Sequence, residues 1–454
     1  MTAERVEPDD GAASLVVPQA CTLVLPTDGA YDSRAWRIAT TLTARGHDVT
    51  VLARSAAGLP DREEHPDGYR ILRVPVSAVA GLPWPVRPVV ERSRRRSRRG
   101  TTLPAPGGAS TDTGSAAPPD GRVRRGLAAV ARLAAIALTV RSQRLATRPV
   151  APASDLVHAM AYMGIPVGLD LGRRDDSPVV YDARDIYVHA RNIARLPAPA
   201  RRLFGWVERR WARAASRVMT VNRPYAEVMA KRFGPPLPAV VMNCSSRRAP
   251  PADRPRRFHD ALALSPTARV VLYQGGLAPH RGIEELIAAL PQLAGNVHLC
   301  LLGYGPLEAA FADDARRDVH RGRLHVLPAV APADLLEWVA SADIVAMPIQ
   351  PSTLNHRLTT PNKLFEAMAV GVPVVASDLP GMAPIVAETG CGVVCDPTDP
   401  GAIAGAIRSI FALPPAERQA MTRRALDAAA GPYSWEAQVA VLLAEYGRLT
   451  GKPW

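Results

Sequence analysis

The sequence predicts an α/β protein with two doubly wound domains, each built on a parallel sheet that helices cover on both faces. Residues 21–26 form an apolar strand, 36–42 a helix with apolar spacing, and 45–54 a turn and second strand. Strand, helix and strand in that order make a βαβ unit, which requires a parallel sheet. After residue 258 the rhythm restarts with continuous apolar strands, which are typical of strands buried on both faces. We therefore expect a cleft between two domains, with ligands at the carboxyl ends of the strands.

The composition along the chain sets the expected domain boundaries. We predict a disordered N-terminus over 1–20, an N-terminal domain over 21–245, a linker over 246–258, a C-terminal domain over 259–432, and a final helix within 433–454. The linker is rich in Pro and Arg. Ser434 is the expected N-cap of the final helix. Within the first domain, residues 82–121 are rich in Pro, Gly, Ser, Thr and Arg and should be disordered, whereas 122–147 should form a basic helix.

Most of the net charge of +13 belongs to residues 87–148, which hold 14 arginines, no lysine and three acidic residues. The simplest interpretation is a solvated loop followed by a marginal helix. A functional interpretation is attachment to an anionic membrane surface, because a basic helix with an arginine cluster binds anionic lipid. Nucleic-acid binding is the rival interpretation, but the segment lacks interleaved aromatic residues and a recognisable module. We therefore expect no specific nucleic-acid partner.

Other bulk features point to a cytoplasmic protein. The start of the chain is acidic and polar, unlike a signal peptide, and no apolar run reaches transmembrane length. The five cysteines are scattered, and Cys391 and Cys395 have no second pair to complete a metal site. Aromatic residues make up 5% of the chain, so little indicates a stacking surface for bases or sugars. We expect reduced, mostly buried thiols.

Lys363 is one of only three lysines in the chain, and it falls in the first turn of a helix predicted over 361–370 with Thr360 as N-cap. A surface ion pair with Glu366 is one interpretation. However, a cation in the first turn opposes the helix dipole, and Lys before Glu is the weaker order for such a pair. An anion at the helix N-terminus fits better, because exposed N–H groups and a compact ammonium both bind phosphate. Glu366, one turn deeper, can accept hydrogen bonds from ribose hydroxyls.

Two glycine-containing turns follow predicted strands in the same domain. Residues 273–287 place Arg281 at the start of a helix predicted over 282–294, and residues 301–306 form the second turn. The glycines of these turns are Gly275, Gly276, Gly303 and Gly305. Glycine allows a nucleotide to approach the backbone closely. A plain turn with a solvated arginine is the commoner case, but two cations at two helix starts together predict a diphosphate site.

With these motifs, the C-terminal half resembles the retaining, nucleotide-sugar-dependent glycosyltransferases of family 4, which are also called glycosyl transferases group 1. The most specific segment is PNKLFEAMAVGVPVVASD at 361–378, and GGLAPHRG, LLGYGP and ADIVAMP fall in the expected order around it. The resemblance runs from Val270 to about Thr398 and extends more loosely over the N-terminal half. It implies the GT-B architecture, with two Rossmann-like domains facing across a cleft and a C-terminal helix that crosses back onto the N-terminal domain.

The resemblance also implies roles for individual residues. The expected donor-binding residues are Gly275, Gly276, Arg281, Gly303, Gly305, Asn362, Lys363 and Glu366. Glu366 would bind the donor ribose, while Arg281 and Lys363 would act as catalytic cations that stabilise the departing nucleotide diphosphate. Asp28 and Gly29 would border the acceptor. The implied mechanism needs no metal and no cofactor besides the nucleotide-diphosphate sugar, because a leaving phosphate oxygen takes the proton of the acceptor hydroxyl.

The chain departs from the family pattern at three positions. Leu358 stands where many members have a first glutamate that reads the donor sugar, and Gly276 stands where many have an arginine. The H-x-H pattern of the N-terminal half is here His158 followed by Met160. His158 stays among the catalytic candidates, although a packing role at a strand end is the alternative. These departures leave the donor sugar open.

Three functions are compatible with the sequence. The first is a glycosyltransferase of polysaccharide or glycolipid biosynthesis, with a nucleotide sugar as donor and a carbohydrate, lipid-linked or small-molecule acceptor. The second is a nucleotide-sugar 2-epimerase, which shares the architecture but needs catalytic carboxylates and a histidine in the cleft. The third is a nucleotide-binding protein without catalysis. A membrane contact through 87–148 would place the protein at the inner face of the plasma membrane.

Overall fold

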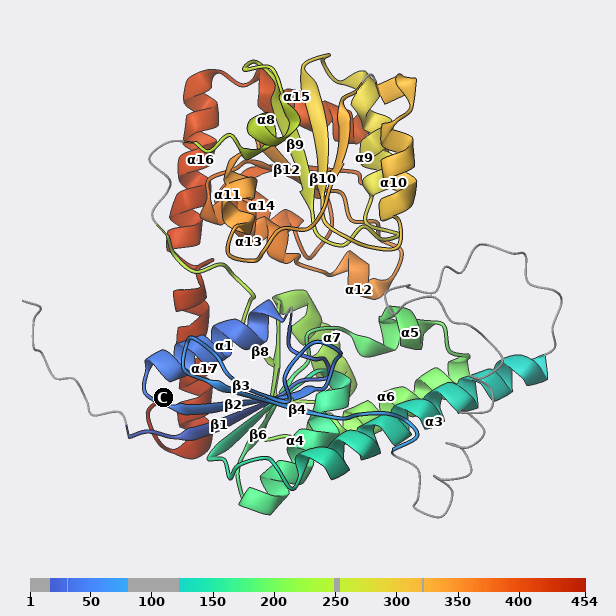
Figure 1. Ribbon diagram of the computed structural model, residues 1–454, viewed down its shortest axis with the longest axis vertical. Coiled ribbons are helices and arrows are strands. Elements are labelled where there is room, and N and C mark those ends of the chain that lie inside the picture. Colours follow the sequence, from blue (N-terminus) through green and yellow to red (C-terminus); the bar gives the residue numbers. More distant parts are fainter. Residues whose placement is uncertain (1–16, 31, 81–121, 249–253, 321) are drawn as a thin grey trace, which may run out of the picture.

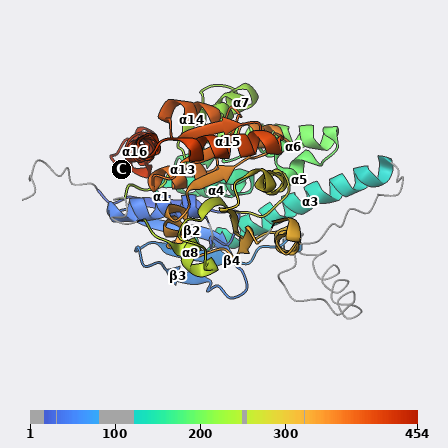
Figure 2. The same ribbon diagram turned by 90° about the horizontal axis from the view of Figure 1, so that it is seen from above.

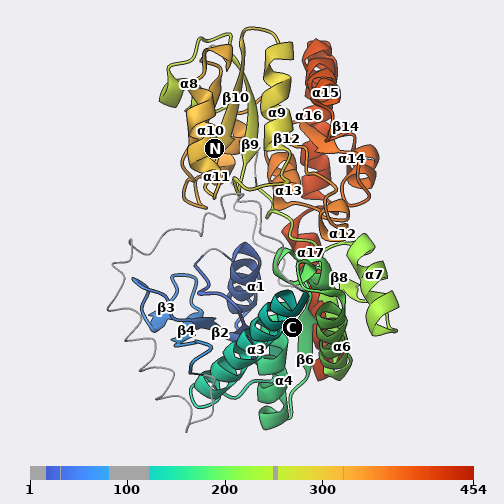
Figure 3. The ribbon, with the colours of Figure 1, turned by 90° about the vertical axis from the view of Figure 1, so that its right-hand side faces the viewer.

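The computed structural model describes residues 17–30, 32–80, 122–248, 254–320 and 322–454. These residues fold into two α/β domains, one above the other along the long axis of the molecule (Figure 1). Figure 3 shows the same two domains from the side, each with a central sheet. The predicted fold class is therefore confirmed.

The N-terminal sheet has the order β3-β4-β2-β1-β5-β6-β7-β8, and only β3, at one edge, runs antiparallel to its neighbour. Its strands are β1 (Ala20–Val24), β2 (Asp48–Arg54), β3 (Arg62–Glu64), β4 (Arg70–Val74), β5 (Leu156–Met160), β6 (Val179–Asp182), β7 (Arg217–Thr220) and β8 (Ala239–Val240). The direction of chain progression reverses between β1 and β5, which pair in parallel. The carboxyl ends of these two strands therefore form a topological switch point, where ligands bind in such sheets.

Helices cover both faces of this sheet. One face carries α1 (Ser33–Ala44), and its buried positions Ala35, Ile38 and Leu42 pack with the strands. The other face is covered by α3 (Arg122–Thr147), α4 (Ala161–Asp175), α6 (Ala198–Ala214) and α7 (Arg223–Phe233). Helix α3 has the bounds predicted from the sequence, and Figures 1 and 2 show that its first turns extend beyond the body of the domain.

The C-terminal sheet is entirely parallel, with the order β11-β10-β9-β12-β13-β14. Its strands are β9 (Arg269–Gln274), β10 (Val297–Leu302), β11 (Leu324–Leu327), β12 (Ile344–Met347), β13 (Val374–Ser377) and β14 (Gly392–Cys395). One face packs against α8 (Arg257–Leu262), α11 (Leu335–Ala340), α13 (Asn362–Ala369), α14 (Ala383–Thr389) and α16 (Pro415–Ala430). The other face packs against α9 (Ile283–Ala289), α10 (Glu308–Ala315) and α15 (Pro400–Ala412).

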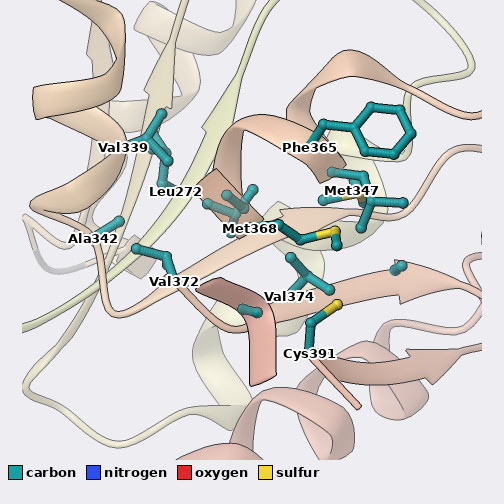
Figure 4. Close-up of a cluster of buried hydrophobic side chains, with 14 of the residues drawn as sticks. Leu272, Val339, Ala342, Met347, Phe365, Met368, Val372, Val374 and Cys391 are labelled. Carbon is teal, nitrogen blue, oxygen red and sulfur yellow. The ribbon is translucent and has the colours of Figure 1, made fainter. Parts of the chain in front are cut away.

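Helix α13 is held against the first of these faces by its apolar side. Phe365 and Met368 lie in one buried cluster with Leu272, Met347 and Val374 of the neighbouring strands (Figure 4). The pattern of apolar residues in this helix thus fixes which side faces the sheet. The opposite side of α13 is left facing the carboxyl ends of the strands.

Helix α17 (Trp435–Thr450) continues from α16 and runs along the N-terminal domain (Figure 1). Ser434 caps it as predicted, because its Oγ accepts a hydrogen bond from the N–H of Ala437 at 3.2 Å. Leu442 and Tyr446 are fully buried in the same cluster as Leu23 of β1. The last helix therefore completes the core of the first domain.

Several boundaries differ from the sequence prediction. The helix predicted over 282–294 ends as α9 at Ala289 and continues only as a 3-10 turn over Leu290–Gln292, since Pro291 has no N–H to donate to a longer helix. Helix α8 begins at Arg257, inside the predicted linker. The disorder expected over 82–121 and most of that over 1–20 lie outside the described residues. Among the described helices, none combines the length and apolar character needed to cross a bilayer.

We expect the contact of α17 with the N-terminal domain to contribute strongly to stability. Leu442→Ala removes a fully buried side chain, and such truncations cost about 2–5 kcal/mol. The matched control is Val441→Ala on the same helix, where the side chain is 41% exposed and the cost should stay within about 0.5 kcal/mol. Thermal unfolding of both variants checks this, and equal melting temperatures would contradict the packing of α17.

Candidate functional site

Helix α13 begins one residue later than predicted. Pro361 occupies the N-cap and the helix starts at Asn362. Thr360 is not the cap, because its hydroxyl donates to the carbonyl oxygen of Gly381 at 2.6 Å and accepts from Nδ2 of Asn222 at 3.0 Å. These tertiary partners take the hydroxyl that a helix cap would need. Lys363 remains in the first turn, as the sequence predicted.

A pocket of about 420 Å³ lies at the carboxyl ends of the C-terminal strands. Its lining includes Gly275, Gly276, Gly303, Asn362, Lys363 and Glu366, together with Gln274, Leu302, Tyr304, Ala329, Val330 and Leu335. Six of the eight donor-site residues predicted from the sequence therefore meet in one place. Arg281 and Gly305 do not line this pocket.

Lys363 does not form the surface ion pair that was the alternative interpretation. Its Nζ lies 3.5 Å from the centroid of the Tyr273 ring, an attraction between a cation and the face of an aromatic ring. Glu366 instead accepts a hydrogen bond at Oε2 from Nε2 of Gln274, at 3.4 Å. The two side chains thus face the pocket with separate partners.

The electrostatics of the pocket favour an anionic ligand. Burial, and then the positive charge of Arg281, hold the pKa of Lys363 well below its usual value, while Glu366 opposes this shift. Burial also raises the pKa of Glu366, against the hydrogen bond from Gln274 and the charges of Arg37 and Lys363. The ammonium form of Lys363 is therefore disfavoured in the free protein, because its positive charge is not fully compensated. A bound diphosphate would supply the missing negative charge.

Arg281 lies close enough to Lys363 to act on its charge, although it stands outside the pocket lining. It precedes Gly282, the left-handed N-cap of α9 with φ of 72°. A Cβ at Gly282 would lie 1.7 Å from the carbonyl oxygen of Pro348, so only glycine fits. This close approach fixes the backbone directly after Arg281. Its charge also lowers the pKa of Asp185 in the N-terminal domain, which burial raises overall.

The glycines of the second turn serve packing between the two turns. A Cβ at Gly303 would lie 2.0 Å from the carbonyl oxygen of Gly275, and a Cβ at Gly305 would lie 2.3 Å from that of Leu277. Gly276, by contrast, has open space around a Cβ. The turns therefore hold each other in place, and Gly305 supports the site without lining the pocket.

The segment before α13 joins the two domains. Within α12 (Leu354–Arg357), Asn355 accepts a hydrogen bond at Oδ1 from the N–H of Ile186 at 3.0 Å and donates from Nδ2 to Asp185 at 2.7 Å. Asn222 donates to the carbonyl oxygen of Leu358 at 2.8 Å. Leu358 itself is 8% exposed and belongs to the hydrophobic cluster of the N-terminal domain. This position, acidic in many family members, is here part of the domain contact.

On the acceptor side, Asp28 and Gly29 lie in the loop after β1, at the topological switch point. Oδ1 of Asp28 accepts from the N–H of Ala30 at 3.0 Å. The carbonyl oxygen of Gly29, a residue with φ of 81°, accepts from Nε1 of Trp36 at 2.9 Å. The loop is thus fixed from α1, and its predicted role beside the acceptor stays a prediction.

The catalytic role considered for His158 is not supported, because the structure buries the residue fully in the N-terminal core. Its Nδ1 is 2.6 Å from the hydroxyl of Tyr446, and its Nε2 is 3.2 Å from Oδ2 of Asp182. The same Oδ2 accepts from Nε of Arg34 at 2.6 Å. Burial alone would raise the pKa of Asp182, but Arg34 and His158 lower it overall. His158 is a packing residue that joins β5 to α17.

Sequence reasoning missed some residues of the site. Tyr273 and Gln274 directly precede the first glycine turn, so their position in the sequence could have indicated that they lie at the site. Arg37 of α1 gave no such signal, because it comes from the other domain. Its charge acts on Glu366, and its Nη1 donates to Oδ1 of Asn243 at 2.8 Å. Within the described ranges, no group of three or more His, Cys, Asp or Glu residues is placed to hold a metal ion. Metal-independent chemistry stays a prediction.

Two family models match the chain. The glycosyl transferases group 1 model matches residues 268–412, and the glycosyl transferase 4-like domain matches residues 29–244. The first match contains the whole pocket, and the second begins at Gly29, within the loop after β1. Together they span most of both domains.

Individual relatives agree with these matches. A D-inositol 3-phosphate glycosyltransferase of Xylanimonas cellulosilytica is 25% identical over 65% of this chain and 72% of its own length. Glycogen synthase of Mycobacterium tuberculosis is 26% identical over 90% and 88%. Among solved structures, sucrose-phosphate synthase of Thermosynechococcus elongatus superposes with a TM-score of 0.69 at 20% identity, over 95% of this chain and 99% of that one. At that identity the likeness shows the fold.

We expect ligand binding to raise the lowered pKa of Lys363, so that binding a nucleoside diphosphate takes up a proton. Affinity should therefore fall as the pH rises through the pKa of the free lysine. Calorimetry in buffers of different ionisation enthalpy measures the uptake. Lys363→Arg, which stays protonated, should abolish it, and Lys363→Met should weaken binding about 10-fold or more. Equal proton uptake in Lys363→Arg and the parent protein would contradict this assignment.

We expect Gly303→Ala to weaken nucleoside-diphosphate binding, since its Cβ would meet the carbonyl oxygen of Gly275 and displace the first turn. Gly295→Ala is the matched control, because nothing lies within 4 Å of a Cβ there and the residue is outside the pocket. Equilibrium binding with fluorescent nucleotide compares the two. Similar affinities in both variants would show that the turns do not shape the site.

Proposed function

The chain belongs to the GT-B glycosyltransferases of family 4, and on that premise we propose that it transfers a sugar, with retention, from a nucleotide-diphosphate sugar to an acceptor hydroxyl. The observation that carries the proposal is the pocket where Asn362, Lys363 and Glu366 meet the glycine turns. A cation, a carboxylate and close backbone in one pocket suit a nucleotide with its ribose and phosphates.

The donor nucleotide would lie with its phosphates at the start of α13. Lys363 and Arg281 stabilise the negative charge that develops on the departing diphosphate, which lowers the barrier where charge forms. Glu366, held by Gln274, accepts hydrogen bonds from the ribose hydroxyls. The acceptor hydroxyl enters on the face that the nucleotide leaves, and a leaving phosphate oxygen takes its proton. No side-chain base is required for this route.

The relatives support a proposal for the chemistry of the partners. One structure of Anabaena HepE contains UDP-glucose, and the curated relatives include D-inositol 3-phosphate glycosyltransferases and glycogen synthase. We propose a nucleotide sugar as donor and a carbohydrate, lipid-linked or small-molecule acceptor at the loop of Asp28 and Gly29. We also propose a cytoplasmic site of action, with residues 87–148 contributing to attachment at the inner face of the membrane.

The rival functions make different demands on the cleft. A 2-epimerase needs a histidine there, and His158 does not supply it, because it is fully buried against Tyr446 of α17. A binding protein without catalysis needs only the nucleotide pocket. Leu358 replaces a residue expected to contact the donor sugar, which is compatible with both rival functions. However, its side chain also has a structural role, because it packs in the contact between the domains.

Incubation with a panel of nucleotide sugars tests the proposal. We expect nucleotide release only when acceptor is present, and NMR should show that the anomeric configuration of the donor is retained. Glu366→Gln and Lys363→Met should each lower kcat/KM by about 10-fold or more, since each removes a hydrogen bond to a charged or polar ligand group. A new sugar isomer without acceptor would indicate epimerisation, and binding without turnover would indicate the third function.

A further inference from the structure

Helix α6 presents an unusual solvent-facing surface. Arg202, Leu203, Trp206, Arg209, Arg210 and Arg213 recur at helical spacing and are all exposed. Leu203 is 54% exposed and Trp206 is 61% exposed, so two large apolar side chains stand among the arginines. We call these six residues the α6 face.

The α6 face carries positive charge only. The one acid of the helix, Glu208, points inward and is 1% exposed; it accepts hydrogen bonds from Nη2 of Arg232 at 2.9 Å and from the hydroxyl of Tyr181 at 3.2 Å. In the part of the chain that the structure describes, Arg209 and Arg210 form no ion pair. Guanidinium groups with no carboxylate partner leave a field that attracts anions.

Neighbouring helices extend this basic surface. A hollow of about 380 Å³ lies between α3, α4 and α6, where Arg144 and Arg173 face Arg210 and Arg213. A second hollow of about 380 Å³ is lined by Trp206, Arg209, Arg210 and Arg213. Asp170 is an acid beside the first hollow, and it pairs with Arg144 at 2.6 Å. The converging guanidinium groups suit phosphate groups presented at a surface.

The inner side of α6 is fixed in the core of the domain. Phe204 and Ala212 are buried in the N-terminal hydrophobic cluster, and Trp211 packs against it. The helix therefore needs no partner to fold, and its outer side presents arginines together with large apolar side chains. An arginine-rich helix with tryptophan and leucine on the same exposed side matches an interfacial helix of a peripheral protein.

We propose that the α6 face docks the protein on an anionic phospholipid bilayer. The arginines bind headgroup phosphates, while Trp206 and Leu203 enter the interfacial layer, where an amphipathic indole is favourable. Nucleic acid fits less well, because Trp206 is the only aromatic residue of the face and Leu203 offers nothing to a phosphate backbone. Docking through this face deepens the proposed function by committing it to a membrane-borne acceptor, but vesicle binding is measured without sugar transfer.

Flotation of the full chain with vesicles tests the surface. We expect binding to phosphatidylglycerol vesicles and not to phosphatidylcholine vesicles. Arg209→Glu/Arg210→Glu should reduce binding at least about 30-fold, since each arginine near an anionic leaflet contributes substantially. The matched control is Arg62→Glu/Arg423→Glu, which makes the same change in net charge at exposed arginines outside the face. Equal losses in both double variants, or none in the first, would overturn the proposal.

Tryptophan fluorescence gives a second readout. Phosphatidylglycerol vesicles should shift the emission of the parent protein to shorter wavelength, and Trp206→Phe should abolish the shift. Trp338→Phe, in the C-terminal domain, should keep it. A shift that survives Trp206→Phe would contradict insertion of the α6 face into the bilayer. An α6 variant that loses binding to RNA but not to vesicles would rule out lipid as the partner of this face. Nucleotide-sugar turnover measured on the same variants separates loss of docking from loss of catalysis.

Discussion

The ammonium of Lys363 is the constraint on which the site depends. It lies over the ring of Tyr273, under the repulsive influence of Arg281 and with its charge disfavoured by burial. A partly buried ammonium that the charge of Glu366 compensates only in part costs free energy in the empty protein. The arrangement persists because the fold of the C-terminal domain stabilises it, and an anion offsets the cost when it binds. The glycine turns and the start of α13 all surround this one charge.

The relation between the domains gives the charge its cleft. Helix α17 leaves the C-terminal domain and completes the core of the other, where Tyr446 joins the buried group of His158, Asp182 and Arg34. A second connection is α12, which is hydrogen-bonded to the N-terminal domain through Asn355. These two connections fix the position of α13 relative to the topological switch point of the N-terminal sheet. They hold together the domain that carries the pocket and the domain that carries the loop of Asp28 and Gly29.

The departures from the family pattern acquire physical meaning in this arrangement. Leu358 packs into the N-terminal cluster, so the segment that could read the donor sugar contributes to domain contact instead. Gly276 faces open space, which leaves room at the pocket where many relatives have an arginine. Both changes affect the region expected to hold the sugar, whereas the residues expected to hold the nucleotide are present. We therefore expect donor-sugar selectivity and nucleotide binding to be separable in this chain.

By itself, the sequence determined the two parallel sheets, the caps of helices such as α17, and most of the pocket, because these follow from the spacing of residues close together in the chain. The first-turn position of Lys363 and the glycine turns are local in this sense. Only the tertiary structure decided the fate of Thr360, His158 and Leu358, whose partners lie more than twenty residues away. The same holds for the α6 face, since the burial of Phe204 and Ala212 in the domain core decides which side of the helix stays exposed. Long-range pairing chooses between such alternatives through burial and hydrogen bonding, and no local pattern encodes that choice.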